Sequence, residues 1–183
     1  MSASGRPELE FNRALAADVR GALERRGLAV RALPEAAFLQ ERTRAAQGAD
    51  LLVSIHHDSV LPERLAQADR YSGFSLFVSR RNPHAAKSLG CASAIGAALR
   101  AAGRVPSRYH AEPIAGENRP FADEMNGVHY FDELIVLRTA AMPAVLVEAG
   151  VIVNRREEAE MLDVAVRRRI AEAIAQGAQA CLP

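Results

Sequence analysis

The sequence has few of the residues that point to a disulfide-stabilised or membrane-embedded protein. Its only cysteines, Cys91 and Cys181, stand far apart and form no Cys-x-x-Cys pair. This spacing predicts no disulfide framework, and we expect Cys91 to be a small core residue of a helix. No apolar run approaches the roughly 20 residues that a membrane-spanning helix needs. Residues 1–5 have neither the basic nor the apolar region of a secretory signal.

A strong net charge is also absent. The 23 basic and 22 acidic residues give a formal net charge of +1, which offers no electrostatic basis for binding nucleic acid or an anionic membrane. Apolar residues make up 49% of the chain and charged residues 25%, as in ordinary globular proteins. The 183 residues are enough to bury a core. We therefore expect one domain over residues 1–183.

The chain opens with a helix rather than with a strand. Phe11, Leu15, Val19 and Leu23 recur every four residues and predict one apolar helix face, and Gly27 is placed to end this helix. The other expected elements are strands at 28–30, 51–55, 73–79 and 144–147, helices at 34–48, 82–102 and 164–180, and a helix capped by Asn154 with Glu157, whereas 128–137 fits either type. This alternation predicts an α/β fold with a largely parallel sheet and helices on both faces.

Two polar residues directly follow apolar strands. His56 comes after residues 51–55, and Glu148 comes after residues 144–147. Because ligands bind beyond the carboxyl ends of strands in α/β sheets, both residues are candidates for a site. Each also has a simpler interpretation, His56 as a structural histidine and Glu148 as a carboxylate that meets water. Strand alternation should turn the neighbouring His57 away from His56.

Glu10 is a third candidate, at the start of the first helix. A glutamate in a first helical turn is favoured by the helix dipole alone, so its position by itself does not require a functional role. Glu10, His56 and Glu148 nevertheless follow one another along the chain in an order that forms a pattern.

This pattern resembles the zinc-dependent N-acetylmuramoyl-L-alanine amidases of the amidase-3 type. That family has a glutamate that opens a helix and a leucine five residues later, as in Glu10 and Leu15 here. It has a strand ending in Ser-Ile-His, matched at residues 54–56, and an apolar strand ending in Val-Glu-(Thr/Ala)-Gly, matched at residues 147–150. The resemblance extends from Glu10 to the last helix and implies the amidase-3, phosphorylase/hydrolase-like fold.

The resemblance also implies roles for the three residues. Glu10 and His56 would be zinc ligands, and Glu148 would be the catalytic carboxylate that takes a proton from water and passes it to the leaving amine. The substrate would be peptidoglycan, cut at the amide between N-acetylmuramic acid and L-alanine. The family acts in the bacterial cell envelope or periplasm, and we carry this location over as an expectation.

One motif of the family is absent. No strand with Gly-His-Gly-Gly, which supplies another zinc-binding histidine, precedes Glu10. Relative to the family we expect a first strand to be missing and a strand edge to be unpaired. His110 or His129 could replace the absent ligand, and residues 110–131 could form a loop over the cleft or a solvated connection.

Three interpretations of the absent motif remain open. The chain could begin downstream of the strand and belong to an active amidase. It could instead be an inactive relative that binds cell-wall fragments or a partner protein, or a zinc peptidase or carboxypeptidase of related fold.

Overall fold

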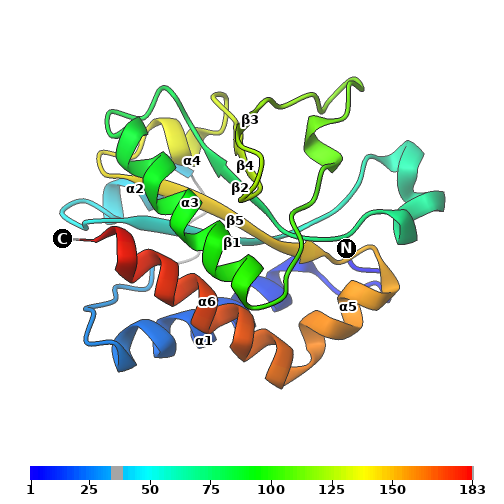
Figure 1. Cartoon of the computed structure of the whole chain (residues 1–183), viewed down its shortest axis with the longest axis horizontal. Coiled ribbons are helices and arrows are strands. Elements are labelled where there is room, and N and C mark those ends of the chain that lie inside the picture. The colour runs from blue at the N-terminus through cyan, green and yellow to red at the C-terminus, as the bar shows by residue number, and fades with distance from the viewer. Residues whose placement is uncertain (34–38, 183) are drawn as a thin grey trace.

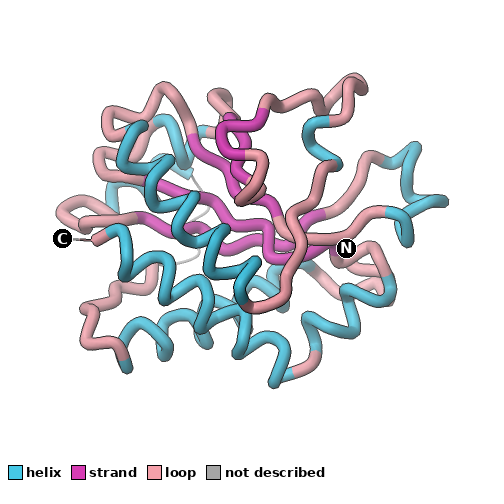
Figure 2. Tube along the Cα trace, viewed as in Figure 1, coloured by secondary structure: helices cyan, strands magenta, loops and turns pink. Residues whose placement is uncertain are grey.

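The computed structural model describes residues 1–33 and 39–182. Its helices and strands alternate along the chain (Figures 1 and 2). They are α1 (Glu8–Arg25), α2 (Leu39–Ala45), β1 (Leu52–Asp58), the 3₁₀ helix η1 (Pro62–Arg70), β2 (Ser75–Val78), α3 (Ala85–Ala101), the 3₁₀ helix η2 (Tyr109–Ala111), β3 (Phe121–Asp123), β4 (Val128–Tyr130), α4 (Ile135–Arg138), β5 (Ala144–Val151), α5 (Arg155–Leu162) and α6 (Val164–Cys181).

The described strands form one mixed sheet in the order β1-β5-β2-β4-β3. β1 is parallel to β5 and β2 is parallel to β4, whereas β5–β2 and β4–β3 are antiparallel. The α/β class is confirmed, but the sheet is less parallel than the sequence predicts. The connection from β1 to β2 contains only the short helix η1. Because no crossover helix carries the chain back along the sheet, β2 begins at the edge where β1 ends and runs in the opposite direction.

The two faces of the sheet carry separate apolar cores. Along β5, Val145 and Val147 belong to the core formed with α1, α3 and α6. The alternate residues, Ala144 and Leu146, pack in a second core with residues of α4 and with Ala46, which follows α2. Figure 1 shows α1, α3 and α6 together on one side of the sheet. This burial on both faces explains why β5 is a continuous apolar run.

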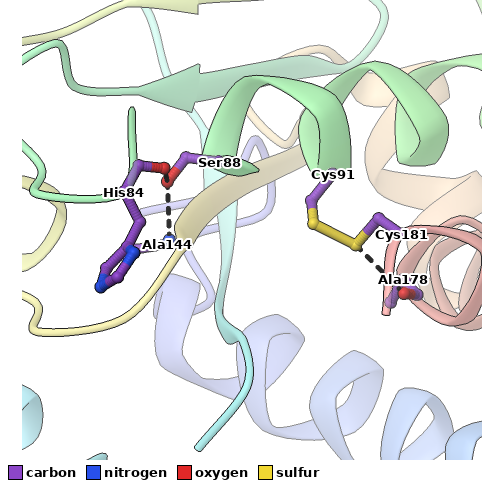
Figure 3. The surroundings of a disulfide bond; sticks show 6 residues. All are labelled: His84, Ser88, Cys91, Ala144, Ala178 and Cys181. Carbon is purple, nitrogen blue, oxygen red and sulfur yellow. Dashed lines mark hydrogen bonds between the residues drawn. A yellow bond between two sulfur atoms is a disulfide. The ribbon is translucent and has the colours of Figure 1, made fainter. Parts of the chain in front are cut away.

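Helices α3 and α6 pack closely and are joined by a disulfide. Cys91 on α3 and Cys181 at the end of α6 form this bond across a sequence separation of 90 residues (Figure 3). The prediction of no disulfide is therefore wrong, although Cys91 is fully buried in the core as expected. Nearby, Gly177 lets the helices approach, because a Cβ there would lie 2.4 Å from the Cα of Ile95.

Several predicted boundaries change in the structure. Residues 28–30 are not a strand, residues 128–137 contain both β4 and α4, and residues 34–38 of the expected 34–48 helix lie outside the described residues. Asn154 caps α5 through its side chain, as predicted. Glu157 does not complete a capping box, because its carboxylate accepts hydrogen bonds from the backbone of Gly73 and Val151. In the described part of the chain, no helix has the length and apolar character to cross a membrane.

Candidate active site

His56 and Glu148 lie side by side on the two parallel strands. They are Cα partners in the register of β1 and β5. Both residues lie within the strands rather than after them, because β1 continues to Asp58 and β5 continues to Val151. Their position near the carboxyl ends of the strands agrees with the location predicted from the sequence.

The first turn of α1 reaches His56 through Glu8. A carboxylate oxygen of Glu8 lies 2.9 Å from His56 Nδ1 and accepts a second hydrogen bond, at 2.7 Å, from the side chain of Asn12. Glu10, the residue predicted for this place, instead forms an exposed ion pair with Arg6 at 3.8 Å. The structure therefore brings Glu8 to His56 and leaves Glu10 at the surface.

Helix geometry explains the choice of Glu8. Phe11 and Leu15, which face the core, follow Glu8 by three and seven residues, so all three lie on one face of α1. Glu10 immediately precedes Phe11 and is rotated by about 100° from it. This helical periodicity favours Glu8, whereas the five-residue spacing to Leu15 in the family pattern favours Glu10.

His57 also contacts α1. Its Nδ1 lies 2.8 Å from the side-chain oxygen of Asn12, and its ring packs against Phe11 at 5.7 Å between centroids. The register of β1 against β5 shifts between His56 and Asp58, so simple alternation does not place the two histidines on opposite sides here. Burial lowers the pKa of His57 to about 4, so this side chain is neutral at pH 7 and acts as part of the packing.

The carboxyl group of Glu8 is strongly acidic. Burial alone would raise its pKa, but hydrogen bonds from His56 and Asn12 outweigh burial and lower the pKa to about 2. Glu8 is therefore an anion at neutral pH. A fixed carboxylate beside an imidazole is a pair of donors suited to a divalent cation.

The carboxyl group of Glu148 has the opposite character. Burial raises its pKa well above the usual range, and the negative charges of Asp58 and Glu8 raise it further. Its Oε2 is buried and has no hydrogen-bond partner among the described residues. These electrostatic interactions place Glu8, Asp58 and Glu148 around one region, in which a proton is held readily on Glu148.

A buried network of polar side chains around His110 adjoins this region. His110 Nε2 lies 2.7 Å from Asp58, and His110 Nδ1 lies 2.8 Å from Glu117. Arg119 forms an ion pair with Glu117, and both His110 and Arg119 act electrostatically to lower the pKa of Glu148. The network connects η2 and the following loop to the end of β1.

The sequence around His110 gave only a weak indication of this network. His110 and Glu117 stand in an aperiodic stretch that we interpreted as either a cleft loop or a solvated connection. The pairing depends on Asp58 at the end of β1, and that contact follows from the folded chain rather than from any local pattern.

Comparison with known families identifies the fold and the family. The model of the Amidase_3 family, described as N-acetylmuramoyl-L-alanine amidase, matches residues 1–180. The chain belongs to this amidase family. A comparison with curated protein sequences found no match to this chain.

Solved structures similar to this amidase-family chain include several amidases. The amidase Ami1 from Mycobacterium smegmatis is 26% identical, with a TM-score of 0.78 over 98% of this chain and 79% of that one. Ami1 from Mycobacterium abscessus is 25% identical, with a TM-score of 0.77 over 98% and 80% of the two chains. The catalytic domain of CwlV from Bacillus (Paenibacillus) polymyxa var. colistinus is 26% identical, with a TM-score of 0.72 over 98% and 87%.

The donors present in this amidase-family chain fit a zinc site in part. Glu8 and His56 offer a carboxylate oxygen and an imidazole nitrogen, both of which zinc accepts, whereas a catalytic zinc site needs three protein ligands. Within residues 1–33 and 39–182, no cluster of three or more His, Cys, Asp or Glu side chains is arranged to hold a metal. His110 and His129, the two possible replacements, do not complete the pair: His110 is engaged by Asp58 and Glu117, and His129 is buried in β4.

Proposed function

We propose that this chain is a hydrolase of the amide bond between N-acetylmuramic acid and L-alanine in peptidoglycan, with Glu148 as its catalytic carboxyl group. Family membership supports the reaction. The observation that carries the proposal is the state of Glu148: its buried Oε2 has no hydrogen-bond partner among the described residues, and burial raises the pKa of its carboxyl group. A buried carboxyl group that holds a proton more readily than usual suits general acid–base catalysis.

Glu148 would act twice in the reaction. It first takes a proton from the water that attacks the amide carbonyl, and it then gives this proton to the nitrogen of L-alanine as the carbon–nitrogen bond breaks. The neighbouring charges of Asp58 and Glu8 favour the protonated form between these steps. His110 and Arg119 act in the opposite direction and lower the pKa of Glu148, which favours the ionised form that takes the proton from water.

We further propose that Glu8 and His56 are two of the ligands of a zinc ion. Their contact at 2.9 Å and the low pKa of Glu8 support this assignment over Glu10. Zinc, when bound, supplies Lewis-acid chemistry and makes a bound water more acidic. The remaining protein ligand stays open in this proposal.

A location in the cell envelope follows from the same proposal. The Cys91–Cys181 disulfide supports it, because such bonds persist in oxidising compartments such as the periplasm or the cell surface. The substrate implied by the family is found there as well.

Two measurements test the proposal. The first is the release of peptide from purified muropeptides by the chain supplied with zinc, compared with Glu148→Gln. Loss of a general acid–base group should lower kcat/KM by about 10²–10⁴-fold. An amidase releases a stem peptide with a free L-alanine amino terminus, whereas a peptidase cuts within the peptide. Unchanged activity in Glu148→Gln, or internal cleavage, would contradict the proposal.

The second measurement is zinc affinity by competition with a chromophoric chelator. We expect Glu8→Gln to weaken binding by at least about tenfold, because a direct ligand is worth no less than an outer-shell partner. Glu10→Gln is the matched control on the same helix turn and should bind zinc like the wild type. Equal effects of the two variants on zinc affinity would contradict the assignment of Glu8 as a zinc ligand.

The incomplete donor set favours one other function, a module that binds cell-wall fragments without cutting them. No group of three or more His, Cys, Asp or Glu side chains that could hold a metal is found in the part of the chain that the structure describes. Under this alternative, binding of muropeptides is unchanged by a chelator and no peptide is released. Chelator-sensitive release of peptide excludes it.

A further inference from the structure

A basic pocket lies beside the candidate active site. It has a volume of about 280 Å³ and lies between η1 and η2, the segments that follow β1 and precede β3. Figure 1 shows both segments, in teal and green, on the side of the molecule where β5 ends. The lining residues are Arg64, Arg70, Tyr71, Ser72, Ser107, Arg108, Tyr109 and Glu112.

Specific contacts hold the walls of this pocket. The hydroxyl of Tyr109 accepts a hydrogen bond from the backbone N–H of Leu61 at 2.8 Å, and the rings of Tyr71 and Tyr109 meet edge to face at 4.8 Å. The side chain of Asn154, which caps α5, donates to the carbonyls of Tyr71 at 2.8 Å and Asp69 at 3.2 Å. The pocket is thus formed before any ligand arrives, which reduces the entropic cost of binding.

The pocket lining has excess positive charge, which favours an anionic ligand. Three guanidinium groups face one carboxylate, that of Glu112. Among the described residues, the only partner found for the Arg70 guanidinium is the neutral side chain of Gln67, and none is found for the Arg64 guanidinium. Arg108 pairs with Glu124 at the surface, where its side chain is 80% exposed, so solvent weakens that pair. Planar guanidinium groups match carboxylates, which they bind through two parallel hydrogen bonds.

A short series of contacts connects the pocket to the end of the sheet that carries Glu148. Tyr109 lines the pocket, and the next residue, His110, contacts Asp58 at the end of β1 at 2.7 Å. Asp58 is the Cα partner of Val151 on β5, the strand that carries Glu148. The pocket therefore borders the end of the sheet at which the strands of His56 and Glu148 finish.

The chemistry of the proposed substrate decides which part enters. The lactyl carboxyl of N-acetylmuramic acid is consumed in the amide bond to L-alanine, so the free carboxylates of the substrate lie on the peptide. From this we infer that the pocket lined by Arg64, Arg70 and Arg108 binds a free carboxylate of the stem peptide. This inference rests on the proposed amidase function and assigns the peptide side of its substrate to the η1–η2 side of the site.

The test measures binding apart from hydrolysis. The full chain carrying Glu148→Gln is titrated, by calorimetry, with N-acetylmuramoyl-peptide whose carboxylates are either free or amidated. We expect the free form to bind more tightly by about tenfold or more, as for one charge-assisted hydrogen bond. Adding Arg64→Gln and Arg70→Gln should abolish this preference. Arg168→Gln is the matched control, since Arg168 is exposed on α6, outside the pocket.

Each outcome decides one claim. Equal affinity for the two peptides, or a preference that survives loss of both arginines, overturns the pocket assignment. Inorganic phosphate that binds as tightly as the free peptide also overturns it, because the pocket would then not select the peptide. Carboxylate-dependent binding without peptide release by the wild type supports the pocket and refutes only the hydrolase.

Discussion

The disulfide between α3 and α6 provides the sharpest test of what stabilises the fold. Replacing both Cys91 and Cys181 with alanine removes the link but keeps the apolar character of the fully buried position 91. The bond closes a loop across a sequence separation of 90 residues. In the chain-entropy model such a loop contributes about 4–5 kcal/mol to the free energy of unfolding, although measured values are commonly about 2–4 kcal/mol.

Urea unfolding followed by circular dichroism measures this contribution. With a slope of about 2 kcal/mol per molar urea, the midpoint should fall by about 1–2 M in the double variant. The wild type treated with a reductant is the matched control, because it loses the bond without any change of side chain. Both forms should still fold, since α3 and α6 also pack through Ile95 and Ile174.

The reasoning fails if oxidised wild type, reduced wild type and the double variant share one midpoint. A fall in the double variant without a fall on reduction would point to lost packing at position 91 rather than to the bond.

Three further predictions concern the helix contact, the buried carboxyl group and a helix cap. Gly177→Ala should lower stability by roughly 1–3 kcal/mol in thermal melts, because its methyl would lie 2.4 Å from the Cα of Ile95. Gly90→Ala, with nothing within 4 Å of the added Cβ, is the control, and equal melting of the two variants would contradict the contact. Because the pKa of Glu148 is raised in the folded state, the folded chain binds more protons above the ordinary value of 4.5, and stability falls as pH rises from there towards the folded pKa. Glu148→Gln should therefore be more stable than wild type at neutral pH and show no such advantage below 4.5, and the opposite trend in urea titrations would refute the assignment. Asn154→Ala should cost about 1 kcal/mol by removing the cap of α5, with no effect on stability as the contrary result.

Local patterns in the sequence were sufficient to predict most of the elements. The four-residue recurrence from Phe11 to Leu23 predicted α1, and the apolar run before Glu148 predicted β5, because a strand buried on both faces must be apolar throughout. The pairing of His56 with Glu148 was also foreseeable, since both follow apolar runs in a parallel arrangement.

Features that depend on how distant elements meet were not predictable in the same way. The disulfide requires α3 and α6 to lie side by side, and the antiparallel direction of β2 depends on a connection without a crossover helix. The choice of Glu8 over Glu10 was available from helical periodicity, because Glu8 shares the face of Phe11. The His110 network needed the contact with Asp58, which no local spacing encodes.

The position of β1 has a consequence for how the molecule assembles. Among the described strands β1 pairs only with β5. His56 and Glu148 therefore become neighbours only when β1 pairs with β5 in the register that joins Leu52 to Ala144. No hairpin brings these strands together early, and closing so long a loop slows folding. His56 and Glu148 therefore come into contact only after β5 (Ala144–Val151) has been synthesised and has paired with β1, so the candidate site cannot form while β5 is missing.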